Sequence, residues 1–277
     1  CGPDSDAMVL TISHQSTAYA GEDAIICEGS TYTISDATAT NAASVLWTTT
    51  GTGVFNNPTS VNPIYIPSQN DILDGFVTLT MYANAASPCP TASDEMVLNI
   101  SRRAVVYAGA DATICEGSVF QLTGATQSFA TGIQWTTTGT GTFDDPASLN
   151  PVYTPGVEDI SSGSVTLTIT GESTSPCSTS SDAMILNISR QAIANAGPDE
   201  TICGASTISL TGASALNQIS VFWTTTGTGT FSSQYMINPV YTPSENDILD
   251  GSVILTMTAY SAGPCNSASD DMILTIE

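Results

Sequence analysis

Residues 135–143 read WTTTGTGTF, a tryptophan followed by threonines and a glycine-rich turn signal. The segment recurs at 223–231 and, with one substitution, as WTTTGTGVF at 47–55. The tryptophans that open the three copies are 88 residues apart, since 135 − 47 = 88 and 223 − 135 = 88. Self-similarity at a fixed period is the signature of a repeat architecture, so the fold of one unit describes the whole chain.

The cysteines follow the same step in two columns. One column holds Cys27, Cys115 and Cys203, and the other holds Cys1, Cys89, Cys177 and Cys265. This frame predicts three complete units, 14–101, 102–189 and 190–277. Residues 1–13 (CGPDSDAMVLTIS) match residues 89–101. We therefore expect residues 1–13 to be the last strand of a truncated upstream repeat, and the chain to be a segment of a longer array.

The composition excludes several classes of partner. The chain has 26 acidic residues against three arginines and no lysine, a net charge of −23. A chain this acidic has nothing to neutralise phosphates, so we expect no nucleic-acid binding. No apolar run is long enough to span a bilayer, so we expect no membrane insertion. The hydrophobic fraction of 41% is regularly patterned, which argues against disorder.

The middle unit has the alternation of half-buried strands. Apolar and polar residues alternate in 119–122, 165–169 and 184–188, and turn signals separate these runs. We expect about seven strands, no helix, and an all-β sandwich in which Trp135 lies over the core. The other predicted core residues are Phe120, Leu122, Val165, Leu167, Leu186 and Ile188.

Several segments carry a resemblance to a known family. AGADATICEGS (108–118), NPVYTP (150–155) and SPCSTSSDAMILNI (175–188) resemble the PKD-like and immunoglobulin-like repeats of very large surface proteins in the Bacteroidota. These include gliding-motility adhesins and other type IX secretion cargo. The resemblance implies tandem immunoglobulin-like (PKD-like) β-sandwich repeats in a secreted stalk or adhesin at the cell surface, and it supplies no catalytic residue. One departure is Gly204, where the other copies have Glu28 and Glu116.

Periodic cysteines without CxxC pairs indicate disulfides formed in an oxidising compartment. Two pairings are open. Bonds within a repeat would be Cys27–Cys89, Cys115–Cys177 and Cys203–Cys265, whereas bonds between neighbours would be Cys27–Cys177 and Cys115–Cys265. In an immunoglobulin-type strand order the two cysteines of one repeat lie at opposite ends, roughly 26 Å apart for an eight-residue strand. Bonded cysteines need Cα atoms roughly 4.4–6.8 Å apart, which favours neighbours, while the count fits pairing within a repeat.

The junctions between repeats contain the chain's basic residues. No Gly/Ser linker separates Ser101 from Arg102, so we expect a stiff joint and a semi-rigid rod. His14, Arg102 and Arg190 share one column, and Arg103 is adjacent. These cations either tie one repeat to acidic groups of its neighbour, such as Glu116 or Asp182, or are solvated surface charges of little energetic value.

Aspartates also recur in columns and are the one candidate for a metal site. Calcium takes six to eight oxygen ligands, often from aspartates. The alternative is that these carboxylates cap turns, and we otherwise expect no cofactor. The calcium candidates are Asp23, Asp94, Asp111, Asp182, Asp199 and Asp270, and a third column with the same step of 88 holds Asp71, Asp159 and Asp247.

The sequence offers no catalytic constellation. Its one histidine, His14, lies at a junction in a single copy, so we expect no enzyme activity. We expect a structural repeat segment of an extracellular adhesin, stalk or surface filament, stabilised by disulfides and giving reach and stiffness. Its partners would be neighbouring repeats and other copies in a fibre. The alternatives are a repeated glycan- or surface-binding module acting by avidity, and accessory domains of a secreted enzyme.

Overall fold

The computed structural model describes residues 2–277, and the predicted disulfide candidate Cys1 lies outside them. Each repeat contains nine short strands and one helix. The first repeat holds β1 (Thr17–Tyr19), β2 (Ala24–Cys27), β3 (Tyr32–Thr33), β4 (Thr38–Thr40), β5 (Ala42–Thr49), β6 (Val54–Phe55), β7 (Ile64–Ile66), α1 (Gln69–Asp74), β8 (Phe76–Ala85) and β9 (Ala92–Ser101).

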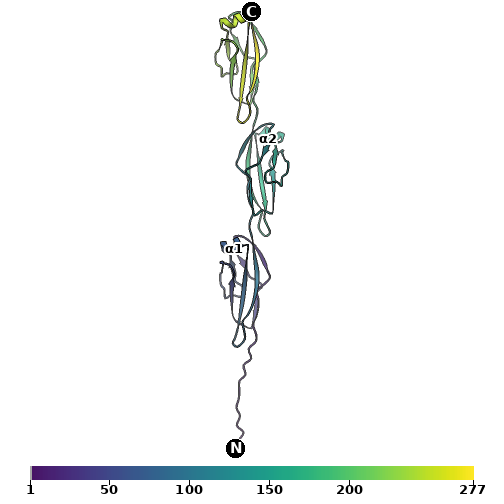
Figure 1. Ribbon diagram of the computed structural model, residues 1–277, viewed down its shortest axis with the longest axis vertical. Coiled ribbons are helices and arrows are strands. Elements are labelled where there is room, and N and C mark those ends of the chain that lie inside the picture. Colours follow the sequence, from purple (N-terminus) through teal and green to yellow (C-terminus); the bar gives the residue numbers. More distant parts are fainter. Residues whose placement is uncertain (1) are drawn as a thin grey trace. The chain divides into compact units, whose positions relative to one another are not determined.

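The next two repeats follow the same order (Figure 1). The second holds β10 (Val105–Tyr107), β11 (Ala112–Cys115), β12 (Phe120–Gln121), β13 (Thr126–Ser128), β14 (Gly132–Thr137), β15 (Thr142–Phe143), β16 (Val152–Thr154), α2 (Val157–Ser162), β17 (Ser164–Glu172) and β18 (Ser180–Ser189). The third holds β19 (Ile193–Asn195), β20 (Glu200–Ile202), β21 (Ile208–Ser209), β22 (Ser214–Leu216), β23 (Gln218–Thr225), β24 (Thr230–Phe231), β25 (Val240–Thr242), α3 (Glu245–Asp250), β26 (Ser252–Ser261) and β27 (Ala268–Ile276).

The strands form the same sheets in every repeat. In the first, a four-stranded sheet has the order β2-β9-β8-β5, a three-stranded sheet β3-β7-β6, and β1 pairs with β4. The pairings are antiparallel, except that β2 runs parallel to the last strand β9. The register of that parallel pair ends with Cys27 opposite Ser101. The last strand therefore lies inside its sheet, and its final residue lies beside a cysteine.

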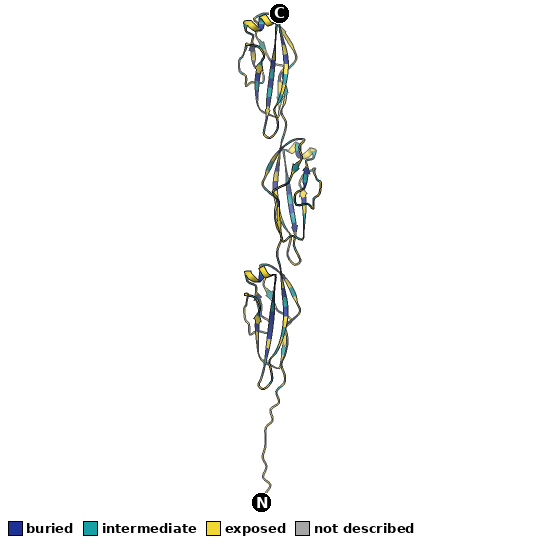
Figure 2. Ribbon diagram, in the orientation of Figure 1, coloured by how far each residue is buried: buried dark blue, intermediate teal, exposed yellow. Residues whose placement is uncertain are grey.

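Side chains alternate between the core and the surface along the long strands (Figure 2). Trp135 and the predicted partners Leu122, Val165, Leu167, Leu186 and Ile188 are all buried, which confirms the predicted core. Phe120 is half-buried instead, because it lies in a two-residue strand at the edge of the smaller sheet. The expectation of an all-β sandwich repeat is thus confirmed.

Two expectations were wrong in detail. The repeats have nine strands rather than about seven, because several strands contain only two or three residues and are too short to show an alternating pattern. Each also has a six-residue helix where none was expected, since a helix this short has no apolar periodicity to detect. Its N-terminus is fixed locally: the Ser68 side chain accepts from Asp71 N, and the Asp71 carboxylate accepts from Ser68 N. Among residues 2–277, no helix has the length and hydropathy needed to cross a membrane.

Backbone contacts divide the chain into two compact units that do not coincide with the repeats. The first unit takes Cys1–Val106 together with Gln127–Gly132 and Thr170–Ser181 from the second repeat. The other takes the rest of the second repeat and the third. Two segments of the second repeat, made of loops and the strand ends that flank them, thus belong to the unit of the first. The repeat boundaries at residues 14, 102 and 190 stay a prediction from the sequence.

Residues 2–13 form no strand, although the sequence predicts one. In Figure 1 they run away from the sheets of the first repeat with no strand beside them. A strand needs a neighbour to satisfy its backbone hydrogen-bonding groups, and none lies next to this segment.

Candidate functional site

Two disulfides join consecutive repeats. Cys27 bonds to Cys177 and Cys115 to Cys265, each across 150 residues and with Cα atoms 4.9 Å apart. The structure therefore has the pairing between neighbours and not the pairing within a repeat. The two bonds have the same geometry, as expected for a device that recurs with the period of the array.

The strand register explains this choice. Cys27 lies opposite Ser101, the last residue of β9, and Cys177 Sγ lies 3.3 Å from the carbonyl oxygen of that same Ser101. In the same way, Cys89 Sγ lies 3.5 Å from the carbonyl oxygen of Ser13, the residue just before its own repeat. One cysteine column therefore marks the end of each repeat and the other marks its beginning. A bond within a repeat would have to span the sandwich.

A carboxylate binds the backbone beside each disulfide. Glu28 Oε1 accepts a hydrogen bond of 3.0 Å from the backbone N–H of Arg103, two residues into the next repeat. Glu116 Oε1 accepts from Gln191 N at 2.8 Å in the corresponding place. Each junction is thus closed by a disulfide and by a charge-assisted hydrogen bond. Gly204 occupies this column in the third repeat and has no side chain to make the bond.

The predicted junction cations have different roles. The Arg102 guanidinium lies 4.4 Å from the centre of the Phe129 ring, within the range of a cation–π contact. Arg190 Nε donates a long bond of 3.5 Å to the Ile160 carbonyl, and His14 is exposed.

The carboxylates suggested as partners for these cations bind backbone instead. Asp182 Oδ2 accepts from Ala108 N at 2.8 Å, and Glu116 accepts from the backbone N–H already described. The Arg102 contact with Phe129 lies within the second repeat, whereas the Arg190 bond to Ile160 joins the third repeat to the second. Arg103 contributes through its backbone N–H to Glu28.

The calcium candidates accept hydrogen bonds from backbone N–H groups beside the sheet strands. Asp23, Asp111 and Asp199 each accept from a backbone N–H of the last strand at 2.8 Å, in the place where β2, β11 and β20 begin. The other aspartate column accepts at the same distance of 2.8 Å from the backbone N–H directly after β1, β10 or β19. Its members are Asp94, Asp182 and Asp270. Among residues 2–277, no three His, Cys, Asp or Glu side chains group as metal ligands.

The third aspartate column, Asp71, Asp159 and Asp247, places one buried carboxylate in each repeat. Asp71 accepts from Thr52 N (2.8 Å), Gly53 N (3.0 Å), Ser68 N (3.0 Å) and the Tyr65 hydroxyl (2.7 Å), and it is fully buried. The same four donors recur around Asp159 and Asp247. Burial raises the pKa of these carboxyls, but the hydrogen bonds outweigh it and lower the pKa, to about 2 for Asp247.

This carboxylate accounts for the glycines of the repeated WTTTGTG segment. A Cβ atom on Gly51, Gly139 or Gly227 would collide with the aspartate carboxylate of its repeat. The sequence did contain a signal for this network. The spacing between that segment, the tyrosine and the aspartate is the same in all three repeats. It marks a structural hydrogen-bond network that holds the loop, the tyrosine strand and the helix together.

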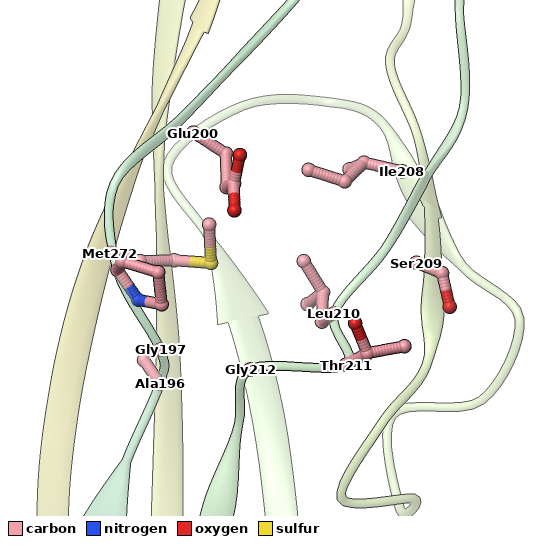
Figure 3. A pocket seen from close by; sticks show the side chains of 10 residues that line it. Ala196, Gly197, Glu200, Ile208, Ser209, Leu210, Thr211, Gly212 and Met272 are labelled. Atoms are coloured by element: carbon pink, nitrogen blue, oxygen red, sulfur yellow. The ribbon is translucent and has the colours of Figure 1, made fainter.

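One surface hollow occurs at equivalent positions in the second and third repeats, and in the second it has a volume of about 270 Å³. Figure 3 shows it in the third repeat, where the side chains of Glu200, Ile208, Leu210 and Met272 surround a cavity of about 30 Å³. A space of this size holds water rather than a substrate. Alanine replaces Glu200 in the two other repeats, so the acidic side chain is not part of a repeated device.

Comparisons with known proteins place the fold. No protein-family model matches the chain, and no curated protein matches it. Among solved structures, a three-domain fragment of the titin I-band is similar at TM-score 0.51 and 12% identity, over 95% of this chain and 96% of that one. A mutated variant of the same three titin domains gives TM-score 0.54 at 12% identity, over 92% and 96%.

A longer chain is also similar in fold. The first eight immunoglobulin domains of Down Syndrome Cell Adhesion Molecule give TM-score 0.61 at 10% identity, and the match covers 95% of this chain and 37% of that one. Identities this low show the fold alone. The chain is therefore built from tandem immunoglobulin-like β-sandwich repeats.

Proposed function

We propose that the chain is a structural segment of an extracellular adhesin, stalk or surface filament, and that its repeats give reach and stiffness. The observation that carries the proposal is the pair of disulfides between consecutive repeats. A disulfide inside a domain stabilises that domain, whereas one across a junction limits movement of one domain against the next. Disulfides persist in oxidising compartments, which supports a place outside the cytoplasm.

The resemblance to surface-protein repeats of the Bacteroidota supports the same role for the parent protein. One structurally similar chain comes from a protein named as a cell adhesion molecule. The acidity of the chain, at −23, suits a solvated and soluble extended protein. The aspartates that a metal-binding or catalytic role would use are occupied by backbone hydrogen bonds, which favours a structural role over an enzymatic one.

The two disulfides overlap along the chain, with a mechanical consequence. Residues 115–177 lie inside both closed loops, so three chain segments connect one disulfide to the other. Cys27–Cys115 and Cys177–Cys265 contain 88 residue steps each, since 115 − 27 = 88 and 265 − 177 = 88, and Cys115–Cys177 contains 62, since 177 − 115 = 62. In the unfolded chain the shortest segment, Cys115–Cys177, becomes taut first. The path from Cys27 to Cys265 then loses 176 of its 238 residue steps, since 265 − 27 = 238 and 238 − 62 = 176.

Single-molecule force spectroscopy of the chain pulled from its ends tests this role. A fully extended residue spans about 3.3–3.6 Å, so reduction should lengthen the completely unfolded chain by roughly 600 Å. The control is the chain with Cys27→Ser and Cys115→Ser, which should have the long extension with or without reductant. Equal extensions of the oxidised and reduced chains would rule out the proposed mechanical role of the disulfides.

Small-angle scattering tests stiffness itself. The oxidised chain should keep a narrow distribution of maximum dimensions, which broadens when the junction disulfides are removed by the same two substitutions. A distribution that does not change would indicate that the junctions owe no rigidity to these bonds.

A further inference from the structure

Three aromatic side chains of the third repeat gather outside its core. Phe222 belongs to β23, Tyr260 belongs to β26, and Tyr235 lies in the loop between β24 and β25. The ring centres of Phe222 and Tyr235 lie 5.4 Å apart, with 48° between the ring planes. Tyr235 is 73% exposed and Tyr260 is 42% exposed. We call these three residues the aromatic platform.

The strand register places two members of the platform on one face of the sheet. Phe222 lies opposite Thr258, and Tyr260 lies two residues further along the same strand, so the two aromatic residues are diagonal neighbours on one face. The buried Trp223 points to the other face, toward the core. The platform therefore lies on the outer side of the sandwich and is not part of its packing.

The platform has no counterpart in the other two repeats. The equivalent positions hold Gln134, Ala147 and Glu172 in the second repeat, and Leu46, Thr59 and Asn84 in the first. The fold is thus built twice in this chain without these aromatic residues. Since folding does not need them, their joint presence in one repeat indicates a binding surface, where amphipathic aromatic side chains are enriched.

A polar hollow adjoins the platform. It has a volume of about 430 Å³, within the range of small-molecule sites. Tyr235 lines it together with hydroxyl and amide side chains, namely Thr225, Thr230, Ser232, Ser233 and Gln234. The Ser232 hydroxyl accepts a hydrogen bond from Val240 N at 3.0 Å, and its own hydrogen can be donated to a ligand. The hollow thus offers hydrogen-bonding groups next to an aromatic ring.

Charge narrows the class of ligand. Where the second repeat has the acidic pair 144–145 and Glu172, the third has two serines, 232–233, and Tyr260. Three carboxylates are therefore replaced by neutral groups at this surface, which suits a neutral ligand. A stable protein interface takes about 800 Å² and roughly 20–30 residues from each partner. Three aromatic side chains and one hollow fit a smaller ligand that has both apolar faces and hydroxyl groups.

We propose that the third repeat binds a neutral carbohydrate. Pyranose rings with equatorial hydroxyls present apolar C–H faces, which would lie on Tyr235 and its neighbours in the platform. Their hydroxyls would exchange hydrogen bonds with side chains of the hollow such as Ser232 and Gln234. The proposal goes beyond the spacer function, because a stalk can be stiff without binding anything. It assigns recognition to one repeat, and it does not require the other two to bind.

Titration calorimetry of the whole oxidised chain tests the proposal. The probes are cellohexaose, xylohexaose and chitohexaose, which are neutral and carry equatorial hydroxyls. At least one of them should bind with one site per chain. Hyaluronan hexasaccharide also has equatorial linkages but is anionic, so it should bind about tenfold more weakly to a chain of net charge −23. If none of the three neutral probes binds, the proposal is overturned.

Variants that copy the second repeat locate the site. Phe222→Gln, Tyr235→Ala and Tyr260→Glu introduce residues that the same fold already contains, and unchanged thermal unfolding checks that the third repeat stays folded. The combined variant should lose binding, and Tyr235→Ala alone should weaken it by about tenfold. The matched control is Tyr107→Ala, which removes a tyrosine that is 49% exposed in the second repeat and should leave the affinity unchanged.

Three results would contradict this location. The combined variant would bind as well as the parent chain, or Tyr107→Ala would weaken binding as much as Tyr235→Ala. The third is a concentration-dependent dimer, seen by light scattering, that Tyr235→Ala converts to a monomer. That result would assign the platform to a second copy of the chain and overturn the carbohydrate proposal.

Discussion

The hydroxyl of Tyr241 donates a 2.7 Å hydrogen bond to the carboxylate of Asp247, six residues further along the chain. Both side chains are fully buried. The remaining carboxylate contacts come from Thr228 N, Gly229 N and Ser244 N, so one anion binds the loop before β24, the strand β25 and the start of α3. Every repeat has this arrangement, which makes it the common internal support of the array.

Removal of that negative charge should destabilise the repeat that contains it. In Asp247→Asn, the amide NH₂ replaces an oxygen that accepts from backbone N–H groups, so donor faces donor in a buried site. We expect a loss of roughly 2–3 kcal/mol in the unfolding free energy of the third repeat. Asp250→Asn, an exposed change in the same helix, is the control and should have no measurable effect. Chemical denaturation followed by Trp223 fluorescence measures both, and equal stabilities would contradict the importance of the network.

The same network predicts how stability depends on pH. Burial raises the pKa of Asp247, but its hydrogen bonds lower it further, to about 2 from an ordinary 3.8. A folded-state pKa below the unfolded one stabilises the fold above pH 3.8, and this contribution is lost as the pH falls toward 2. At about 1.4 kcal/mol per pKa unit, the loss is about 2 kcal/mol for this repeat. Asp247→Asn should remove that part of the acid dependence.

The tyrosines set the alkaline limit. Burial is the main cause that raises the pKa of Tyr65, Tyr153 and Tyr241 to about 12 from 10.0. Because the folded pKa exceeds the unfolded one, this stability is fully present below pH 10 and is lost as the pH rises toward 12. The free energy of unfolding, measured by chemical denaturation from about pH 8 to about pH 12, should show this decline. If the decline in stability is equally large in the variant with all three tyrosines changed to Phe, groups other than these tyrosines cause it.

The sequence predicts most of the core but little of the network. Trp135 and Leu167 belong to strong period-two patterns, so their burial follows from local alternation. Asp159 lies in a polar stretch whose pattern is typical of a turn, and its burial depends on Gly141 and Tyr153, which are brought to it by tertiary folding. The disulfide pairing could be predicted only in part. Strand order favoured bonds between neighbours, but only the parallel register that sets Cys27 opposite Ser101 selects them.

Calcium removal should leave the stability unchanged. One carboxylate oxygen of Asp23, and likewise of Asp94, is occupied by a backbone N–H at 2.8 Å. These bonds satisfy the carboxylates without a cation, as turn- and strand-capping aspartates do. Calorimetry with EDTA and with added calcium chloride should give the same melting temperature, and magnesium chloride controls for ionic strength. A rise with calcium alone would revive the metal-site interpretation.

The carboxylate at the junction should protect one backbone amide. Glu116 Oε1 accepts from Gln191 N at 2.8 Å, and the residue at this position in the third repeat is Gly204, which has no side chain to make such a bond. In Glu116→Ala we expect exchange of the Gln191 amide hydrogen to accelerate about tenfold, which corresponds to about 1.4 kcal/mol, while the Cys115–Cys265 bond stays intact. Glu158→Ala, an exposed acidic residue in α2, is the matched control. If exchange at Gln191 were equal in the two variants, the disulfide alone would account for the order of the junction. A selective increase would show that the hydrogen bond and the disulfide restrain it independently.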